Sequence, residues 1–161
     1  MAYFSPAEWP RVVLMRPDFR ATLLAVMNEF EEQTGKKTYV PAQGGHRGEG
    51  VQGAIHADSL AQGFRAAPAG ESAHEFGAAG DLVIVGKPPQ NAERDQRDPD
   101  YQVLAEISRR HGLRPGFYFT SGKPDPYHHD TGETLAVMRE KWNGLKKKGS
   151  SLLSSSSLPS S

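Results

Sequence analysis

Two short segments of this chain carry the side-chain types that bind a catalytic metal ion. Residues 72–81 read SAHEFGAAGD, and residues 125–128 read DPYH. Two histidines and one aspartate are an ordinary ligand set for catalytic zinc, with a fourth position left for water. His74, Asp81 and His128 are therefore the candidate ligands of one Zn²⁺ ion per chain. Asp125, three residues before His128, is a candidate base for that water.

The spacing between His74 and Asp81 predicts a turn. On a helix the two residues would share a face, but Gly77 and Gly80 would each cost about 1 kcal/mol in its interior. On one continuous strand the odd spacing would place the two side chains on opposite faces. We therefore expect a turn at Gly77, with Asp81 at the start of a buried strand and both side chains directed to one point. Taken alone, such a pair is more often a loop histidine and a turn-capping aspartate; the second segment favours a metal site.

The pattern Ser-x-His-x-x-Gly-x-Ala-x-Asp, followed by acid-x-x-His, resembles the signature of the LAS-type zinc peptidases. This family groups lysostaphin, D-alanyl-D-alanine carboxypeptidases and the hedgehog signalling domain, and the resemblance covers roughly residues 18–142. It implies that Asp125 is the base and that Ser72 binds substrate or orients the site. Successive strand residues face opposite sides, so only one of His128 and His129 can reach the metal. The family spacing selects His128, and His129 is expected to donate a hydrogen bond or to face solvent.

The family also carries an arginine, in a Ser-Gly-Tyr-Arg-like motif, that binds the substrate carbonyl or carboxylate and stabilises the oxyanion. Two positions match it. Arg47 follows Gly45 and His46 and lies well upstream of His74, as the family pattern requires, although His46 replaces the tyrosine. Arg65 follows Gly-Phe, which looks like the motif itself, but it lies only nine residues before His74. We favour Arg47 as the substrate-binding and catalytic arginine and keep Arg65 as the alternative.

The resemblance implies a zinc peptidase that acts on a peptidoglycan stem peptide or a small D-amino-acid peptide. The expected activity is L-alanyl-D-glutamate endopeptidase or D-alanyl-D-alanine carboxypeptidase, in a phage-type lysis or virion-associated enzyme. One alternative is a catalytically inactive zinc-binding module that binds wall peptides or a protein partner. Another is a cytoplasmic D-alanyl-D-alanine dipeptidase. Asp125 separates the enzymes from the binding module, because a binding module needs no base.

The composition limits the number of domains, the type of zinc site and the classes of partner that we expect. The 161 residues suit one domain with its own core, and the absence of cysteine excludes a thiolate zinc site. Nineteen basic and nineteen acidic residues cancel, so the net charge indicates no nucleic-acid partner. No apolar run approaches the ~20 residues of a membrane span, and the N-terminus lacks a signal-peptide layout. We expect a monomer that is made in the cytoplasm and acts on the cell wall if released by a pore or carried in a virion.

The elements that must position these residues suggest an α+β domain, with helices packed on one side of a small antiparallel sheet. By resemblance the fold is like that of hedgehog and D-Ala-D-Ala peptidases. Apolar periodicity predicts helices over 18–34, near 56–62, over 101–111 and near 132–145, and strands over 36–40, 81–85 and 117–120. Phe4 and Trp9 anchor a packed N-terminal arm. We expect a zinc peptidase domain over 1–148 and a disordered Ser-rich tail over 149–161.

Overall fold

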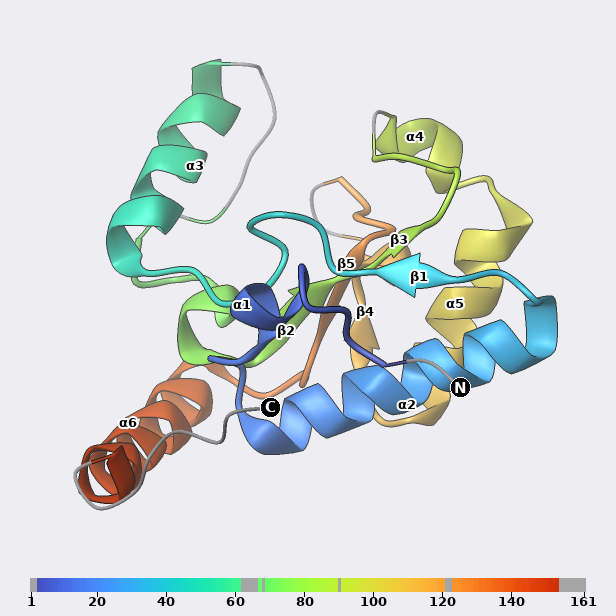
Figure 1. Cartoon of the computed structure of the whole chain (residues 1–161). Coiled ribbons are helices and arrows are strands. Elements are labelled where there is room, and N and C mark those ends of the chain that lie inside the picture. Colours follow the sequence, from blue (N-terminus) through green and yellow to red (C-terminus); the bar gives the residue numbers. More distant parts are fainter. Residues whose placement is uncertain (1–2, 62–66, 68, 90, 121–122, 154–161) are drawn as a thin grey trace.

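The computed structural model describes residues 3–61, 67, 69–89, 91–120 and 123–153. Over these residues the chain forms short strands connected by helices, two of them 3-10 helices (Figure 1). In chain order the elements are α1 (Trp9–Val12), α2 (Pro17–Thr34), β1 (Thr38–Tyr39), α3 (Glu49–Ala61), η1 (Ala73–Phe76), β2 (Ala79–Asp81), β3 (Val83–Ile84), α4 (Ala92–Asp95), α5 (Pro99–Arg110), β4 (Arg114–Pro115), η2 (Gly116–Tyr118), β5 (His128–Asp130) and α6 (Leu135–Leu153).

A three-stranded antiparallel sheet with the order β2–β5–β4 lies at the centre of the molecule. Asp81 of β2 pairs with His128 of β5, and Arg114 of β4 pairs with Asp130 of β5. A second, two-stranded antiparallel sheet pairs β1 with β3. The expected α+β class with small antiparallel sheets is confirmed.

Two predicted strands differ from those observed. The sequence predicts one strand over 81–85, but β2 ends at Asp81 and β3 begins at Val83. The break arises because the chain pairs with β5 as far as Asp81 and with β1 from Val83 onward. The predicted strand over 117–120 is wrong, because Gly116–Tyr118 form the 3-10 helix η2 and the nearby strand is the earlier β4.

The main core lies between α2, α5 and the strands. Figure 1 shows α2 along one side of the strands and α3 projecting from the opposite side. The apolar residues of α2 recur at helical spacing, as the sequence predicts, and the structure packs them against α5. Phe4 and Trp9 pack against the same core, although part of the expected N-terminal arm is the short helix α1. The fully or almost fully buried members from α2 and α5 are Phe19, Leu23, Val26, Met27, Phe30, Tyr101, Leu104, Ala105 and Ile107.

The C-terminal helix α6 packs against the segment that carries His74. Met138 is 1% exposed and packs with Phe76 and Ala78, next to the turn that carries His74. The helix does not end near residue 145, as the sequence predicts, but continues to Leu153, so it includes the first residues of the expected tail. Residues 154–161 lie outside the described part of the chain. Within the described part, no helix is both long and apolar enough to cross a membrane.

Candidate metal centre

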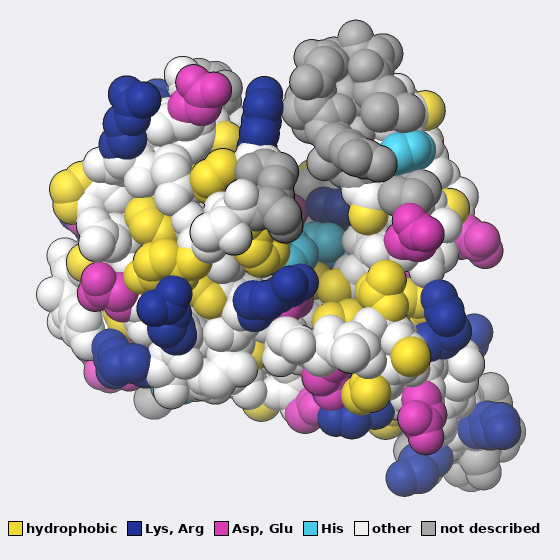
Figure 2. All heavy atoms as spheres, turned by 180° about the vertical axis from the view of Figure 1, so that it is seen from behind, with side chains coloured by type: hydrophobic (Ala, Val, Ile, Leu, Met, Phe, Trp, Pro, Cys, Tyr) yellow, Lys and Arg dark blue, Asp and Glu magenta, His cyan; other side chains and the backbone are white. Residues whose placement is uncertain are grey.

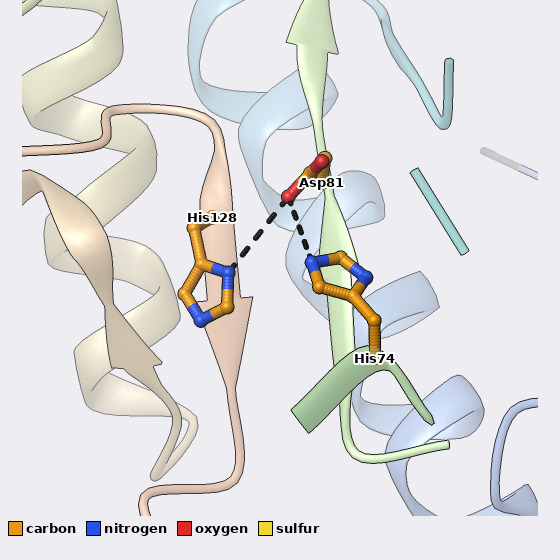
Figure 3. A group of neighbouring side chains, drawn as sticks. All are labelled: His74, Asp81 and His128. Atoms are coloured by element: carbon orange, nitrogen blue, oxygen red, sulfur yellow. Dashed lines mark ion pairs between the residues drawn. The ribbon is translucent and has the colours of Figure 1, made fainter. Parts of the chain in front are cut away.

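The three predicted ligands meet at one point. His74 lies in η1, Asp81 ends β2 and His128 begins β5, and one ligand atom from each lies within 4.8 Å of the others. Oδ1 of Asp81 is 3.4 Å from Nε2 of His74 and 3.9 Å from Nδ1 of His128. Figure 3 shows the two imidazole rings on either side of this carboxylate. The pairing of β2 with β5 places Asp81 opposite His128, and the preceding turn brings His74 to them.

The turn before β2 is built by local capping. The Ser72 hydroxyl accepts a hydrogen bond from the His74 N–H at 3.3 Å, and the Glu75 carboxylate accepts one from the Ser72 N–H at 2.9 Å. This reciprocal pair is a capping box. The predicted turn at Gly77 is confirmed: Gly77 has φ +63°, and a Cβ there would come within 2.7 Å of the Arg16 backbone nitrogen. Ser72 is 6% exposed, and its hydroxyl is occupied in this cap.

One nitrogen of each candidate ligand histidine makes a hydrogen bond, which leaves the other nitrogen available to bind a metal ion. Nδ1 of His74 lies 2.9 Å from the Gly45 carbonyl oxygen, and Nε2 of His128 lies 2.7 Å from Oδ2 of Asp130. Both partners only accept, so each of these nitrogens donates an N–H. In a neutral ring the lone pair is then on Nε2 of His74 and on Nδ1 of His128. These are the two nitrogens that lie towards Asp81.

The surroundings of the Asp81 carboxylate test whether a metal ion fits between the three candidate ligands. Its Oδ1 atom is fully buried and has no hydrogen-bond partner among the residues that the structure describes. Buried polar atoms are almost always paired, and a bound ion or water is one explanation of an exception. Burial would raise the pKa of Asp81, but interactions with His74, His128 and Arg47 lower it to about 2. A carboxylate that is ionised at neutral pH, together with the lone pairs of two neutral imidazoles, is a suitable donor set for zinc.

Arg47 is held directly beside this carboxylate. Its Nη2 donates to Oδ2 of Asp81 at 3.2 Å, its Nη1 to Oε1 of the buried Gln52 at 3.2 Å, and its Nε to the Gln43 carbonyl at 2.7 Å. A guanidinium has five N–H donors, so two remain for another acceptor. The structure therefore brings Arg47 to the candidate site, whereas the alternative, Arg65, lies outside the described residues.

Asp125 lies in the loop before β5, close enough to interact electrostatically with the ligands. Its backbone N–H donates to the Gly116 carbonyl at 2.9 Å, and its Oδ1 accepts from the Tyr127 N–H at 3.1 Å. Burial raises the pKa of the Asp125 carboxyl, and the negative charge of Asp81 raises it further. A carboxyl with a raised pKa next to the metal ligands suits a proton acceptor.

His129 faces the opposite side of β5 from His128. It is fully buried, and its Nδ1 lies 2.8 Å from the Ser108 hydroxyl. Burial lowers the pKa of His129 to about 3, so this ring stays neutral. The sequence left two possibilities for His129, a hydrogen bond or solvent exposure. The structure shows a hydrogen bond and no exposure to solvent. The structure thus brings His128, and not His129, to the ligand cluster.

Two contributors to the site were not identified from the sequence. Asp130 and the Gly45 carbonyl contact the two candidate ligand histidines. Gly45 is 29 residues from its partner His74, and a backbone carbonyl cannot be recognised from a side-chain pattern. Asp130 did leave a signal, because residues two apart on a strand point to the same face. The His-x-Asp spacing of β5 could therefore have indicated it.

The surface is hollowed on the side turned away in Figure 1. Figure 2 shows this hollow with histidine side chains at its floor and a basic side chain inside it. A cavity of about 470 Å³ lies between α3 and the loop after β1 and is lined in part by Arg47. A second cavity of about 330 Å³ is lined in part by Arg114 and Phe119. The Phe119 ring lies 5.6 Å from that of His128, so the second cavity is close to the candidate metal centre.

Comparison with known proteins identifies the fold. No protein-family model and no curated protein sequence matches the chain. Among solved structures it resembles the L,D-carboxypeptidase DacB from Streptococcus pneumoniae, with 16% identity and a TM-score of 0.55 over 81% of this chain and 72% of that one. It resembles the LD-carboxypeptidase LdcB, described with the basis of its peptidoglycan recognition, with 16% identity and a TM-score of 0.55 over 81% and 71%. DacB from strain D39 of the same organism matches with 15% identity and a TM-score of 0.51 over 79% and 72%. The chain therefore has the mixed helix-and-sheet fold of these carboxypeptidases.

Proposed function

We propose that this protein is a zinc-dependent peptidase of the LAS type that hydrolyses peptide bonds of bacterial peptidoglycan. The observation that carries the proposal is the buried Asp81 oxygen without a hydrogen-bond partner between the imidazoles of His74 and His128. The shared fold supports it, because the similar structures are carboxypeptidases and one of them is described with peptidoglycan recognition.

The residues around the centre suit amide hydrolysis. Zinc held by His74, Asp81 and His128 would acidify a water molecule and polarise a carbonyl oxygen. A carboxylate oxygen of Asp125 takes the proton of the attacking water and later returns it to the leaving amine nitrogen. The raised pKa of Asp125 suits both transfers, because it moves the carboxyl towards neutral pH. The two N–H groups of Arg47 that have no partner among the described residues bind the developing oxyanion.

The proposed substrates are small anionic peptides of the cell wall. One arginine beside the metal site matches one free carboxylate, as in a peptide with a terminal D-alanine, or the negatively charged D-glutamate of a stem peptide. D-alanyl-D-alanine carboxypeptidase and L-alanyl-D-glutamate endopeptidase are therefore the activities to test. We further propose a phage-type role in lysis or in the virion.

The decisive experiment measures newly released amine termini. Zinc-loaded protein is incubated with purified peptidoglycan, with synthetic stem peptides and with free D-alanyl-D-alanine. We expect release from wall or stem peptides, and we expect Asp125→Asn to remain folded and zinc-loaded while losing about 10²–10⁴-fold in turnover. Cleavage of the free dipeptide alone would favour a dipeptidase. If the zinc-loaded wild type released no amines from any substrate, a non-catalytic zinc-binding module would replace this proposal.

A further inference from the structure

We propose that Asp130, held in place by Arg114, is a positioning residue that determines which nitrogen of His128 faces the metal. The inference rests on the metal site of the proposed function, but it does not require that the site hydrolyses peptides. Asp130 is a buried, charged side chain that is neither one of the three proposed metal ligands nor the proposed base.

Asp130 is placed to control the His128 ring. It lies two residues after His128 on β5, so both side chains point to the same face of the strand. Its Oδ2 atom is 2.7 Å from Nε2 of His128, and its side chain is completely buried. This is a short, charge-assisted contact shielded from solvent.

The carboxylate of Asp130 cannot easily rotate away. Arg114, its cross-strand neighbour on β4, donates from Nε to Oδ1 at 3.0 Å and from Nη2 to Oδ2 at 2.7 Å. The Gly132 N–H donates to Oδ1 at 2.7 Å. Each oxygen therefore accepts from two donors, and the orientation of the carboxylate is fixed. Arg114 also lies over the Phe119 ring, whose centroid is 5.6 Å from that of His128.

This arrangement has a consequence for the tautomer of His128. An ionised carboxylate only accepts hydrogen bonds, so Nε2 must carry the hydrogen and Nδ1 must carry the lone pair. His74 shows the reverse choice, because the Gly45 carbonyl lies against its Nδ1. The two ligand histidines thus present different nitrogens, each selected by a different acceptor. Only the acceptor at His128 is a side chain that a substitution can change.

The alternative role of the Arg114–Asp130 ion pair is purely structural, to join β4 to β5. The variant Asp130→Asn distinguishes this structural role from the proposed positioning of His128. An amide has one oxygen. The Gly132 N–H and Nε of Arg114 both favour it at the Oδ1 position, against the single donor Nη2 of Arg114 at the Oδ2 position, which then loses its acceptor. The NH₂ group then faces Nε2 of His128 and donates to it. The hydrogen of the ring must move to Nδ1, where it blocks the metal.

The test measures zinc affinity and the imidazole tautomer, not turnover. Zinc binding is measured by competition with a chromophoric chelator, and the tautomer by NMR of isotope-labelled imidazoles in metal-free protein at alkaline pH, where the rings are neutral. We expect the Nε2–H form of His128 in the wild type and the Nδ1–H form in Asp130→Asn, with about 10–100-fold weaker zinc binding. Ser108→Ala is the matched control, because it removes the partner of the neighbouring His129 and should leave zinc affinity and the His128 tautomer unchanged.

Two further variants keep the proposal falsifiable if Asp130→Asn does not fold. Asp130→Ala removes the acceptor without supplying a donor and should abolish the tautomer preference. Arg114→Gln acts at a side chain that is 57% exposed and should weaken zinc binding, because only the Gly132 N–H then remains to fix the orientation of the Asp130 carboxylate. Wild-type zinc affinity and tautomer in the folded variants would overturn the proposal. A wild type that binds zinc but cleaves nothing would overturn the proposed peptidase and leave this inference standing.

Discussion

Replacing Gly116 with alanine should disturb the metal centre without altering any of its ligands. Gly116 lies beneath the loop that leads into β5, and its carbonyl oxygen accepts the backbone N–H of Asp125 at 2.9 Å. A Cβ at this position would lie 2.5 Å from the Asp125 carbonyl oxygen and 3.1 Å from Cβ of His128. The substituted residue therefore meets both the proposed base and one proposed ligand.

The size of the effect follows from these distances. Ordinary van der Waals contact begins near 3.4 Å, so the Asp125 carbonyl must move by about 0.9 Å and His128 by about 0.3 Å. The obstacle at Asp125 is a backbone oxygen, which cannot rotate away as a side chain could. A displacement of ~1 Å at a reacting group can cost ~10²-fold in rate, and overpacking typically costs about 1–3 kcal/mol of stability. We expect both losses for Gly116→Ala, with zinc binding weakened less than turnover because His128 moves less.

Gly144→Ala is the matched control. Gly144 lies in α6, and a Cβ there meets no atom of the described residues within 4 Å. Alanine in a helix interior should leave the protein equally stable or stabilise it by up to about 1 kcal/mol. Thermal unfolding, zinc content and turnover on a stem peptide are measured for both variants. The reasoning is refuted if Gly116→Ala unfolds and turns over like the wild type.

Three other predictions concern single side chains. His128→Ala should lose most of its zinc in elemental analysis, whereas His129→Ala should be less stable but retain the metal. Arg47→Ala should retain zinc but lose about 10²–10³-fold in turnover; the same loss in Arg65→Ala, with Arg47→Ala unaffected, would reverse the two roles. Two basic neighbours lower the pKa of Glu133 from 4.5 to about 2, although burial opposes them. Its ion pairs therefore stabilise the fold above pH 4.5 and stop doing so as the pH falls through 2, so the melting-temperature difference between wild type and Glu133→Gln should shrink over that range.

Local sequence was sufficient for the parts of the molecule that depend on neighbouring residues. The helix α2 ends at Gly35, as its apolar period and the following glycine predict. The turn at Gly77 followed from the cost of glycine in a helix and from the odd spacing of His74 and Asp81. Residue type and order identified the three residues that the fold brings within 4.8 Å of one another.

Short strands were harder to predict, because two or three residues contain too little periodicity. The apolar run after Gly80 looks like one strand, yet it is divided between two sheets at Leu82. Which partner a segment pairs with depends on hydrogen bonds to residues about fifty positions away along the chain. The mistaken strand over 117–120 has the same origin, since weak alternation cannot separate a strand from the turn of η2.

The orientation of the site was decided by the tertiary structure alone. The sequence by itself determined which side chains could bind zinc, because ligand chemistry is a property of residue type. The nitrogen that each histidine presents depends instead on a carbonyl from Gly45 and on a carboxylate clamped by Arg114. Likewise, the ion pair of Arg47 with Asp81 exists because the segment after β1 folds back over β2. The contacts made by Gly45, Arg114 and Arg47 join segments that are distant in sequence, and no local pattern encodes the distance between them.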